Sequence, residues 1–158
     1  MIGAALLSTC HLLALAIGVP GVVLRGVALR GLEKGDESAF SRLFTADAAW
    51  GLAALLWLGT GLTRAFGPFE KGSAYYLHSG PFLIKVGLYA AIAAIEVWPM
   101  ITFLRWRVAR AKQQPIDRAL VPRLRVLNDL EVALTLAIPF CASLMARGVG
   151  FGLFDHVS

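Results

Sequence analysis

Residues 2–24, IGAALLSTCHLLALAIGVPGVVL, form an apolar segment without a charged side chain. A helix needs about 20 consecutive apolar residues to cross a hydrocarbon layer about 30 Å thick, and this segment reaches that length. It lacks the basic region that precedes the apolar core of a secretory signal peptide. We therefore predict a retained first transmembrane helix over residues 2–24.

Three further apolar segments follow, and charged blocks separate them. They predict helices over about residues 43–62, 82–104 and 126–145. Hydrophobic residues make up 58% of the 158-residue chain, charged residues make up 16%, and the mean hydropathy is +0.69. A soluble domain of this size does not contain so large a fraction of apolar residues. The sequence therefore predicts one all-α membrane domain over residues 1–158, a bundle of four transmembrane helices.

The lysines and arginines are distributed unevenly between the two sides that these helices define. Eleven of the 15 lie in the segments after the first and third predicted helices, three lie on the opposite side, and Lys85 lies inside a helix. Because cytoplasmic loops carry the excess of basic residues, we predict that both termini face the periplasm. This pattern is typical of a multi-pass protein of a bacterial inner membrane.

The net charge of +5 does not indicate a nucleic-acid partner. The basic residues flank the apolar segments, where anionic lipid headgroups account for them, so membrane lipids are the predicted partners. Cys10 and Cys141 lie far apart inside apolar segments. This placement argues against a disulfide framework and predicts that both residues are buried as small apolar side chains.

Few ionisable groups occur inside the apolar segments, where each charge costs roughly 2.5–3.5 kcal/mol on insertion scales. His11 is predicted near the membrane centre and Lys85 about one turn into the third helix from the same face, so the two could meet in one layer. Each has an alternative role: His11 could hydrogen-bond a neighbouring hydroxyl or carbonyl, and Lys85 could reach the headgroups. Glu96 follows Lys85 by eleven residues and falls on the same helix face nearer the cytoplasm.

A second group of polar residues is predicted at the cytoplasmic level of Glu96. It consists of residues near the starts of the second and fourth predicted helices, namely Asp47, Asn128, Asp129 and Glu131. We predict an acidic layer there, which arginines of the adjoining loops neutralise. The alternative is that the three carboxylates of this group cap first helical turns.

Small residues recur in the second predicted helix. Its segment WGLAALLWLGTG, residues 50–61, contains Gly51, Ala54, Gly59 and Gly61. Small residues let helix backbones approach closely in membranes, so we interpret them as packing residues of the bundle.

Two stretches carry a resemblance to known proteins. RLFTADAAWGLAALLWLGTGLTRAFGPFEKGSAYYLHSGPFLIKVGLY (42–89) and EVWPMITFLRWR (96–107) resemble a four-span bacterial membrane family, domain of unknown function 2214, and the resemblance covers nearly the whole chain. The layout is also similar to the haem-dependent protoporphyrinogen oxidases of the HemJ type and, more distantly, to the CopD membrane domain. The matching parts are the histidine of CHLLALAIG (10–18), the lysine of GPFLIKVGL (80–88) and the polar segment RVLNDLE (125–131).

The resemblance to these oxidases implies a b-type haem. By that resemblance, His11 would be an axial ligand of the haem iron and Lys85 a second group at the cofactor. The chain departs from the oxidases later in the third helix, because Ile95 and Glu96 stand where those proteins carry a tyrosine and a histidine. This departure puts the oxidase activity in doubt.

Two functional hypotheses fit these residues. In the first, the protein is a haem-binding redox protein in which His11 binds iron, Lys85 binds iron or a propionate, and Glu96 handles protons. In the second, it is an accessory or assembly subunit of a larger membrane complex, or a homo-oligomer, whose polar residues only lock the bundle. A visible absorption spectrum separates the two hypotheses.

Overall fold

The computed structural model describes residues 2–67 and 79–147, and these residues are helical apart from short turns. The long helices are α1 (Ile2–Glu33), α2 (Ala39–Phe66), α4 (Gly80–Ala111) and α5 (Val121–Ala146), and a short 3₁₀ helix, η1 (Arg118–Leu120), precedes α5. The described part of the chain contains four helices that are long and apolar enough to cross a membrane. The predicted all-α bundle of four transmembrane helices is confirmed.

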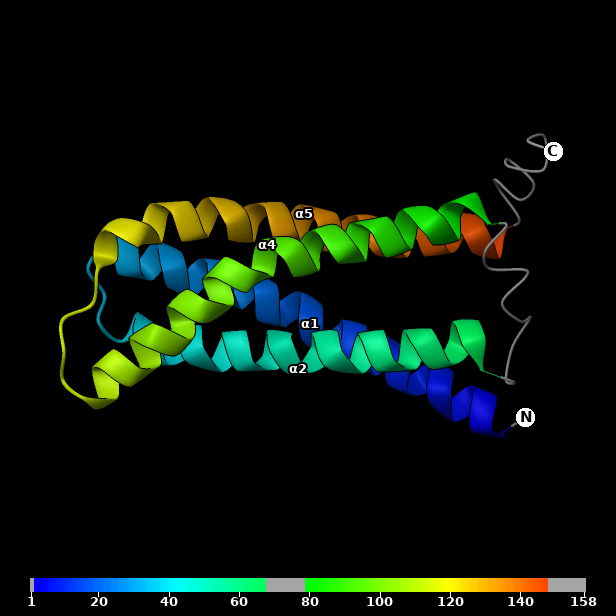
Figure 1. Ribbon diagram of the computed structural model, residues 1–158, viewed down its shortest axis with the longest axis horizontal. Coiled ribbons are helices and arrows are strands. Elements are labelled where there is room, and N and C mark those ends of the chain that lie inside the picture. The colour runs from blue at the N-terminus through cyan, green and yellow to red at the C-terminus, as the bar shows by residue number, and fades with distance from the viewer. Residues whose placement is uncertain (1, 68–78, 148–158) are drawn as a thin grey trace.

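The four helices run along the long axis of the molecule (Figure 1). The α1–α2 and α4–η1 connections lie at one end, which we call the connection end, and the start of α1 and the last turn of α5 lie at the other, the terminal end. α1 packs along α2 and α5, and α4 packs along α5, whereas α2 and α4 touch only sparsely. The bundle therefore has one loose seam, between α2 and α4.

The helices extend further toward the connection end than the sequence predicts. α1 continues to Glu33 instead of residue 24, α4 continues to Ala111 instead of residue 104, and α5 begins at Val121 instead of residue 126. The added segments are rich in arginine, leucine and alanine, which favour helix, and α1 ends just before Gly35, whose φ is 86°. Arg25, predicted in a loop, consequently lies inside α1 and is fully buried.

α1 and α2 approach each other at three glycines of α1, namely Gly18, Gly21 and Gly31. A Cβ added at Gly18 would lie 3.2 Å from the Ala53 Cβ, and one added at Gly21 would lie 3.1 Å from the Trp50 backbone nitrogen. A Cβ added at Gly51 would meet nothing within 4 Å. The expectation that Gly51 brings helices together is wrong. The glycines at the close approach of α1 and α2 belong to α1.

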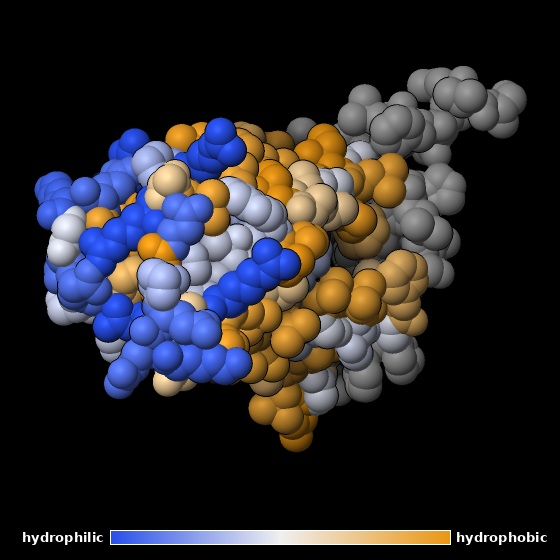
Figure 2. Space-filling view, turned by 60° about the vertical axis from the view of Figure 1, so that its left-hand side comes forward, coloured by the Kyte–Doolittle hydropathy of each residue, from blue (hydrophilic) through white to orange (hydrophobic). Residues whose placement is uncertain are grey.

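The surface of the bundle differs between its two ends. Figure 2 shows hydrophilic side chains gathered at the connection end and hydrophobic ones over much of the remaining face. Large apolar side chains are exposed along all four long helices, as expected where lipid is the solvent. Cys10 is among the exposed residues and Cys141 is half-buried, both with free thiols, so the predicted burial of Cys10 is wrong. The placement of the connection end in the cytoplasm stays a prediction.

Candidate functional site

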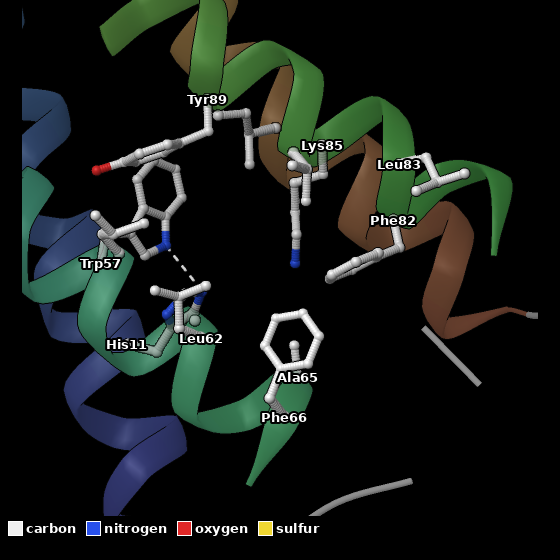
Figure 3. Close-up of a pocket in the computed structure, with 13 residues that line it drawn as sticks. His11, Trp57, Leu62, Ala65, Phe66, Phe82, Leu83, Lys85 and Tyr89 are labelled. Atoms are coloured by element: carbon white, nitrogen blue, oxygen red, sulfur yellow. Dashed lines mark hydrogen bonds between the residues drawn. The ribbon is translucent and has the colours of Figure 1, made fainter. Parts of the chain in front are cut away.

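An apolar cavity of about 360 Å³ lies in the terminal half of the bundle. All four long helices contribute to its lining, and the polar atoms come from His11, Trp57, Lys85 and Tyr89 (Figure 3). Most of the remaining lining is aliphatic or aromatic. Because α2 and α4 supply most of the walls, the cavity lies along the loose seam between these two helices.

The imidazole of His11 is held by two side chains of α2. Trp57 Nε1 donates to His11 Nε2 over 2.8 Å, and His11 Nδ1 lies 2.8 Å from Thr60 Oγ1. The Thr60 hydroxyl is itself directed at the Leu56 carbonyl oxygen, 2.6 Å away, so its hydrogen is used and Nδ1 is the donor to Oγ1. His11 is therefore a neutral imidazole with both ring nitrogens engaged, which is the hydroxyl-bonding role that its position in the sequence allowed.

Lys85 and Tyr89 enter the cavity from one face of α4, since residues four apart lie above one another on a helix. The Lys85 side chain points into the cavity (Figure 3), and its Nζ lies 5.6 Å from the centroid of the Phe82 ring. The Tyr89 hydroxyl donates to the Ala54 carbonyl over 2.9 Å, and its ring meets Trp57 edge-on. Tyr89 thus links α4 to α2 beside the cavity. The structure brings His11 and Lys85 to the same cavity, as their depth in the sequence suggests.

A second constellation lies nearer the connection end and is centred on the fully buried Arg25. Its Nη1 donates to Glu96 over 2.8 Å and 3.0 Å and lies 3.4 Å from Asp47. Its Nη2 pairs with Glu131, and its Nε donates to Asn128 over 2.8 Å. One guanidinium from α1 therefore gathers carboxylates from α2, α4 and α5. We call these five residues the Arg25 cluster.

Aromatic rings and a second arginine surround the Arg25 cluster. The Arg25 guanidinium carbon lies 5.9 Å from the Trp50 ring centroid and 5.7 Å from that of Phe103. Trp50 Nε1 also donates to Glu96 over 3.0 Å, and Arg107 lies 3.4 Å from Asp47. These contacts enclose a guanidinium in an aromatic cage, where cation–π attraction and ion pairing act together.

The capping role considered for the carboxylates of this layer is wrong. Asp47 and Glu131 lie well inside α2 and α5 because both helices begin earlier than predicted, so neither carboxylate is near the backbone N–H groups of a first turn. Both face Arg25 instead. Asp129 is half-exposed and lies 3.5 Å from Arg30. The expected acidic layer is present, but an arginine inside a membrane helix, rather than one in a loop, neutralises its centre.

Sequence reasoning missed Arg25, Trp50 and Tyr89 as members of these sites. The signal for Arg25 is the apolar pattern of VALRGLE, residues 27–33, which continues beyond the arginine and is typical of an unbroken helix. No group of three or more His, Cys, Asp or Glu side chains within residues 2–67 and 79–147 could hold a metal ion. His78 and His156 lie outside the described residues.

The helices and the two buried constellations define a four-span helical membrane protein. Over residues 4–150 the chain matches the family model of the predicted membrane proteins DUF2214, and it belongs to that family. No curated protein and no solved structure matches the sequence. The resemblance to HemJ-type oxidases and to the CopD domain stays a prediction.

Proposed function

We propose that the protein binds a lipid-soluble molecule that carries an acidic group, in the cavity between α2 and α4. The observation that carries this proposal is the position of Lys85, a cation that points into a cavity with apolar walls (Figure 3). Binding sites of this kind are mostly apolar with few polar groups that orient the ligand. The aliphatic and aromatic lining suits a hydrocarbon or ring system, and the ammonium group suits a carboxylate or phosphate.

The fold supports entry of such a ligand from the bilayer. α2 and α4 make few contacts with each other, so the seam between them offers a lateral path for a molecule that is already dissolved in lipid. Lys85 lies near the start of α4, close to the membrane interface, whereas Trp57 and Tyr89 lie deeper. An amphiphile would therefore place its acidic group beside Lys85 and its apolar part along Trp57 and Tyr89.

Haem b is a specific version of this ligand, because its propionates are carboxylates and its ring is apolar. The arrangement of His11 does not fit an axial ligand, since Nε2 accepts a hydrogen bond from Trp57 and Nδ1 is bonded to Thr60. Iron coordination would require one of these bonds to break. We therefore derive no redox chemistry from this site, and haem binding stays a prediction that the absorption spectrum of the purified protein tests.

Mass spectrometry of the bound ligand tests the proposal. The protein is purified from its native membrane in mild detergent, extracted with organic solvent and compared with Lys85→Gln and with Lys112→Gln, an exposed lysine at the far end of the same helix. We expect one acidic amphiphile in wild type and in Lys112→Gln, reduced at least tenfold in Lys85→Gln. Equal amounts in all three would contradict the proposal, as would the absence of any acidic amphiphile. The extract also distinguishes a phospholipid from a free carboxylic acid.

The accessory-subunit hypothesis is a separate prediction. It expects the protein to migrate in native membranes as part of a complex much larger than its own 17.0 kDa. Native electrophoresis of solubilised membranes, followed by detection of this chain, measures that directly. Migration as a monomer, with the acidic amphiphile still bound, would favour the binding function.

A further inference from the structure

The Arg25 cluster and its neighbour Arg107 contain more carboxyl groups than guanidinium groups. Arg25 and Arg107 face the carboxyls of Asp47, Glu96 and Glu131. With every group ionised, the set carries a formal charge of −1 inside a transmembrane bundle. An uncompensated buried charge is costly, and a buried carboxyl is commonly neutralised by a proton instead.

The hydrogen bonds indicate which carboxyl oxygen is not engaged. Both oxygens of Glu96 accept from Arg25, and one of them also accepts from Trp50. The two oxygens of Asp47 face Arg25 and Arg107 respectively. Glu131 uses Oε2 toward Arg25, whereas its Oε1 is buried and has no hydrogen-bond partner. Within this cluster, Oε1 of Glu131 is the one carboxyl oxygen that no donor reaches.

Besides Arg125 Nε, two further polar atoms of α5 share this condition. Asn128 Nδ2 and Thr135 Oγ1 are also buried without a hydrogen-bond partner, and with Glu131 they occupy positions i, i+3 and i+7, which lie on one face of a helix. The exposed fractions of Asn128, Glu131 and Thr135 are 2%, 0% and 1%. Buried polar atoms in native proteins are normally bonded, and a proton on Oε1 of Glu131 would convert this unbonded acceptor into a donor.

We propose that Glu131 is a proton-binding site, with the proton on Oε1. Addition of one proton to the carboxylate gives a neutral carboxylic acid and brings the formal charge of the five ionisable groups to zero. It also removes the repulsion between the carboxylates of Glu131 and Glu96, which both face Arg25. The new O–H is a donor where none existed.

Glu131 lies nearer the connection end than the ligand cavity, and its helix, α5, also lines that cavity. Ile138 of α5 lines the cavity, and at 1.5 Å per residue it is about 10 Å from Glu131 along the helix. The ionisable groups that face the site come from α1 (Arg25), α2 (Asp47) and α4 (Glu96, Arg107). The proton site does not depend on which ligand the cavity binds. Failure of one proposal therefore leaves the other intact.

Infrared spectroscopy tests the assignment. At neutral pH, exposed carboxylates are ionised, so a carbonyl band of a protonated carboxylic acid, identified by its downward shift in D2O, reports a buried acid. We expect this band in wild type in lipid nanodiscs and its loss in Glu131→Gln, whose neutral amide has the shape of the protonated acid. Glu131→Gln should also unfold at nearly the wild-type temperature. Asp129→Asn, which removes a half-exposed carboxyl outside the cluster and leaves the charge of the cluster unchanged, is the matched control and should keep the band.

The outcomes separate clearly. Absence of the band in wild type would overturn the proposal, and so would a band that survives in Glu131→Gln. If Glu131→Gln does not fold, Glu131→Asp, which keeps the acid but moves it, should retain the band at a shifted frequency. A band at the wild-type frequency in Glu131→Asp would contradict the proposal.

Discussion

The surroundings of a charged side chain differ between the two halves of the bundle. At the level of Arg25, carboxylates from three other helices and two aromatic rings close around one guanidinium, which is fully buried. At the level of Lys85, the cation faces a cavity of about 360 Å³ whose lining is almost entirely apolar. The helices that meet at the cavity, α2 and α4, also touch each other only sparsely.

This difference separates a group that fastens helices from a group that faces a cavity. A charge inside a membrane protein must be compensated, and Arg25 is compensated by side chains of the bundle itself. Lys85 points into the cavity, where the proposed ligand would place its acidic group. Substitutions at the first level should therefore change stability, and substitutions at the second should change binding with little loss of stability.

The largest effect is expected for Arg25→Met, which leaves one buried and two partly buried carboxyls without their common partner. Breaking a buried ion pair by removing one member costs about 3–5 kcal/mol, so this variant should unfold at a much lower temperature or fail to accumulate. The matched control is Arg30→Met, because Arg30 is half-exposed and its pair with Asp129 spans 3.5 Å; a pair of this kind is worth at most about 1 kcal/mol. Equal thermal stability of the two variants in detergent would contradict the role of Arg25 as the group that fastens the helices.

A smaller loss is expected where α1 meets α2. In Gly21→Ala the new Cβ would lie 3.1 Å from the Trp50 backbone nitrogen and 3.3 Å from the Ala46 carbonyl oxygen, so the two backbones must separate, and such overpacking costs about 1–3 kcal/mol. Gly51→Ala introduces the same methyl group into open space and should be neutral or slightly stabilising. Thermal unfolding of both variants compares them, and a Gly51→Ala loss as large as that of Gly21→Ala would contradict the packing.

His11→Ala tests the cavity half. It removes the hydrogen bonds to Trp57 and Thr60, each worth about 0.6 kcal/mol in membranes, and so should lower the unfolding temperature only slightly. The absorption spectrum should be unchanged, because we assign His11 to hydrogen bonding. Loss of a Soret band in this variant would instead establish the haem hypothesis.

The smallest effect is expected in the α1–α2 connection, outside the membrane. The Ser38 hydroxyl and the Arg42 guanidinium bond to the Asp36 carboxylate and hold the pKa of Asp36 below its usual value. A carboxyl with a lowered pKa stabilises the fold above its ordinary pKa of about 3.9, and this stabilisation is lost as the pH falls through the folded-state pKa. Asp36→Asn should therefore lower the unfolding temperature slightly at pH 7. The difference from wild type should vanish in acid, whereas a pH-independent difference would exclude this cause.

Much of the fold and part of the site could be predicted from the sequence. Four apolar segments determine four membrane helices, and the depth of His11 and Lys85 within two of them is enough to expect a shared layer. The Arg25 cluster could not be predicted, because a charged residue after an apolar segment normally marks the membrane boundary. Only the tertiary contacts with Glu96 and Glu131 offset the free-energy cost of burying that arginine. Because the predicted helices also begin too late in the sequence, carboxylates that face the bundle interior are assigned to helix caps.

The sequence also does not show which glycines lie at the contact between two helices. Gly18, Gly21 and Gly51 are all glycines inside apolar helices, and nothing in their local sequence tells which of them faces another helix. The rotation of a membrane helix is set by packing rather than by hydropathy, because every face is apolar. The structure resolves this by placing Gly18 and Gly21 against α2 and Gly51 toward open space.

The most direct test of the cavity as an acid-binding site is quenching of Trp57, which lines it, by a long-chain fatty acid brominated along its chain. The signal of Trp57 is obtained in nanodiscs as the difference between wild type and Trp57→Phe. We predict saturable quenching by the acid, at least tenfold weaker with its methyl ester and at least tenfold weaker in Lys85→Gln. Equal quenching by acid and ester, or quenching that does not saturate, would show that Lys85 does not select an acidic group and would contradict the account.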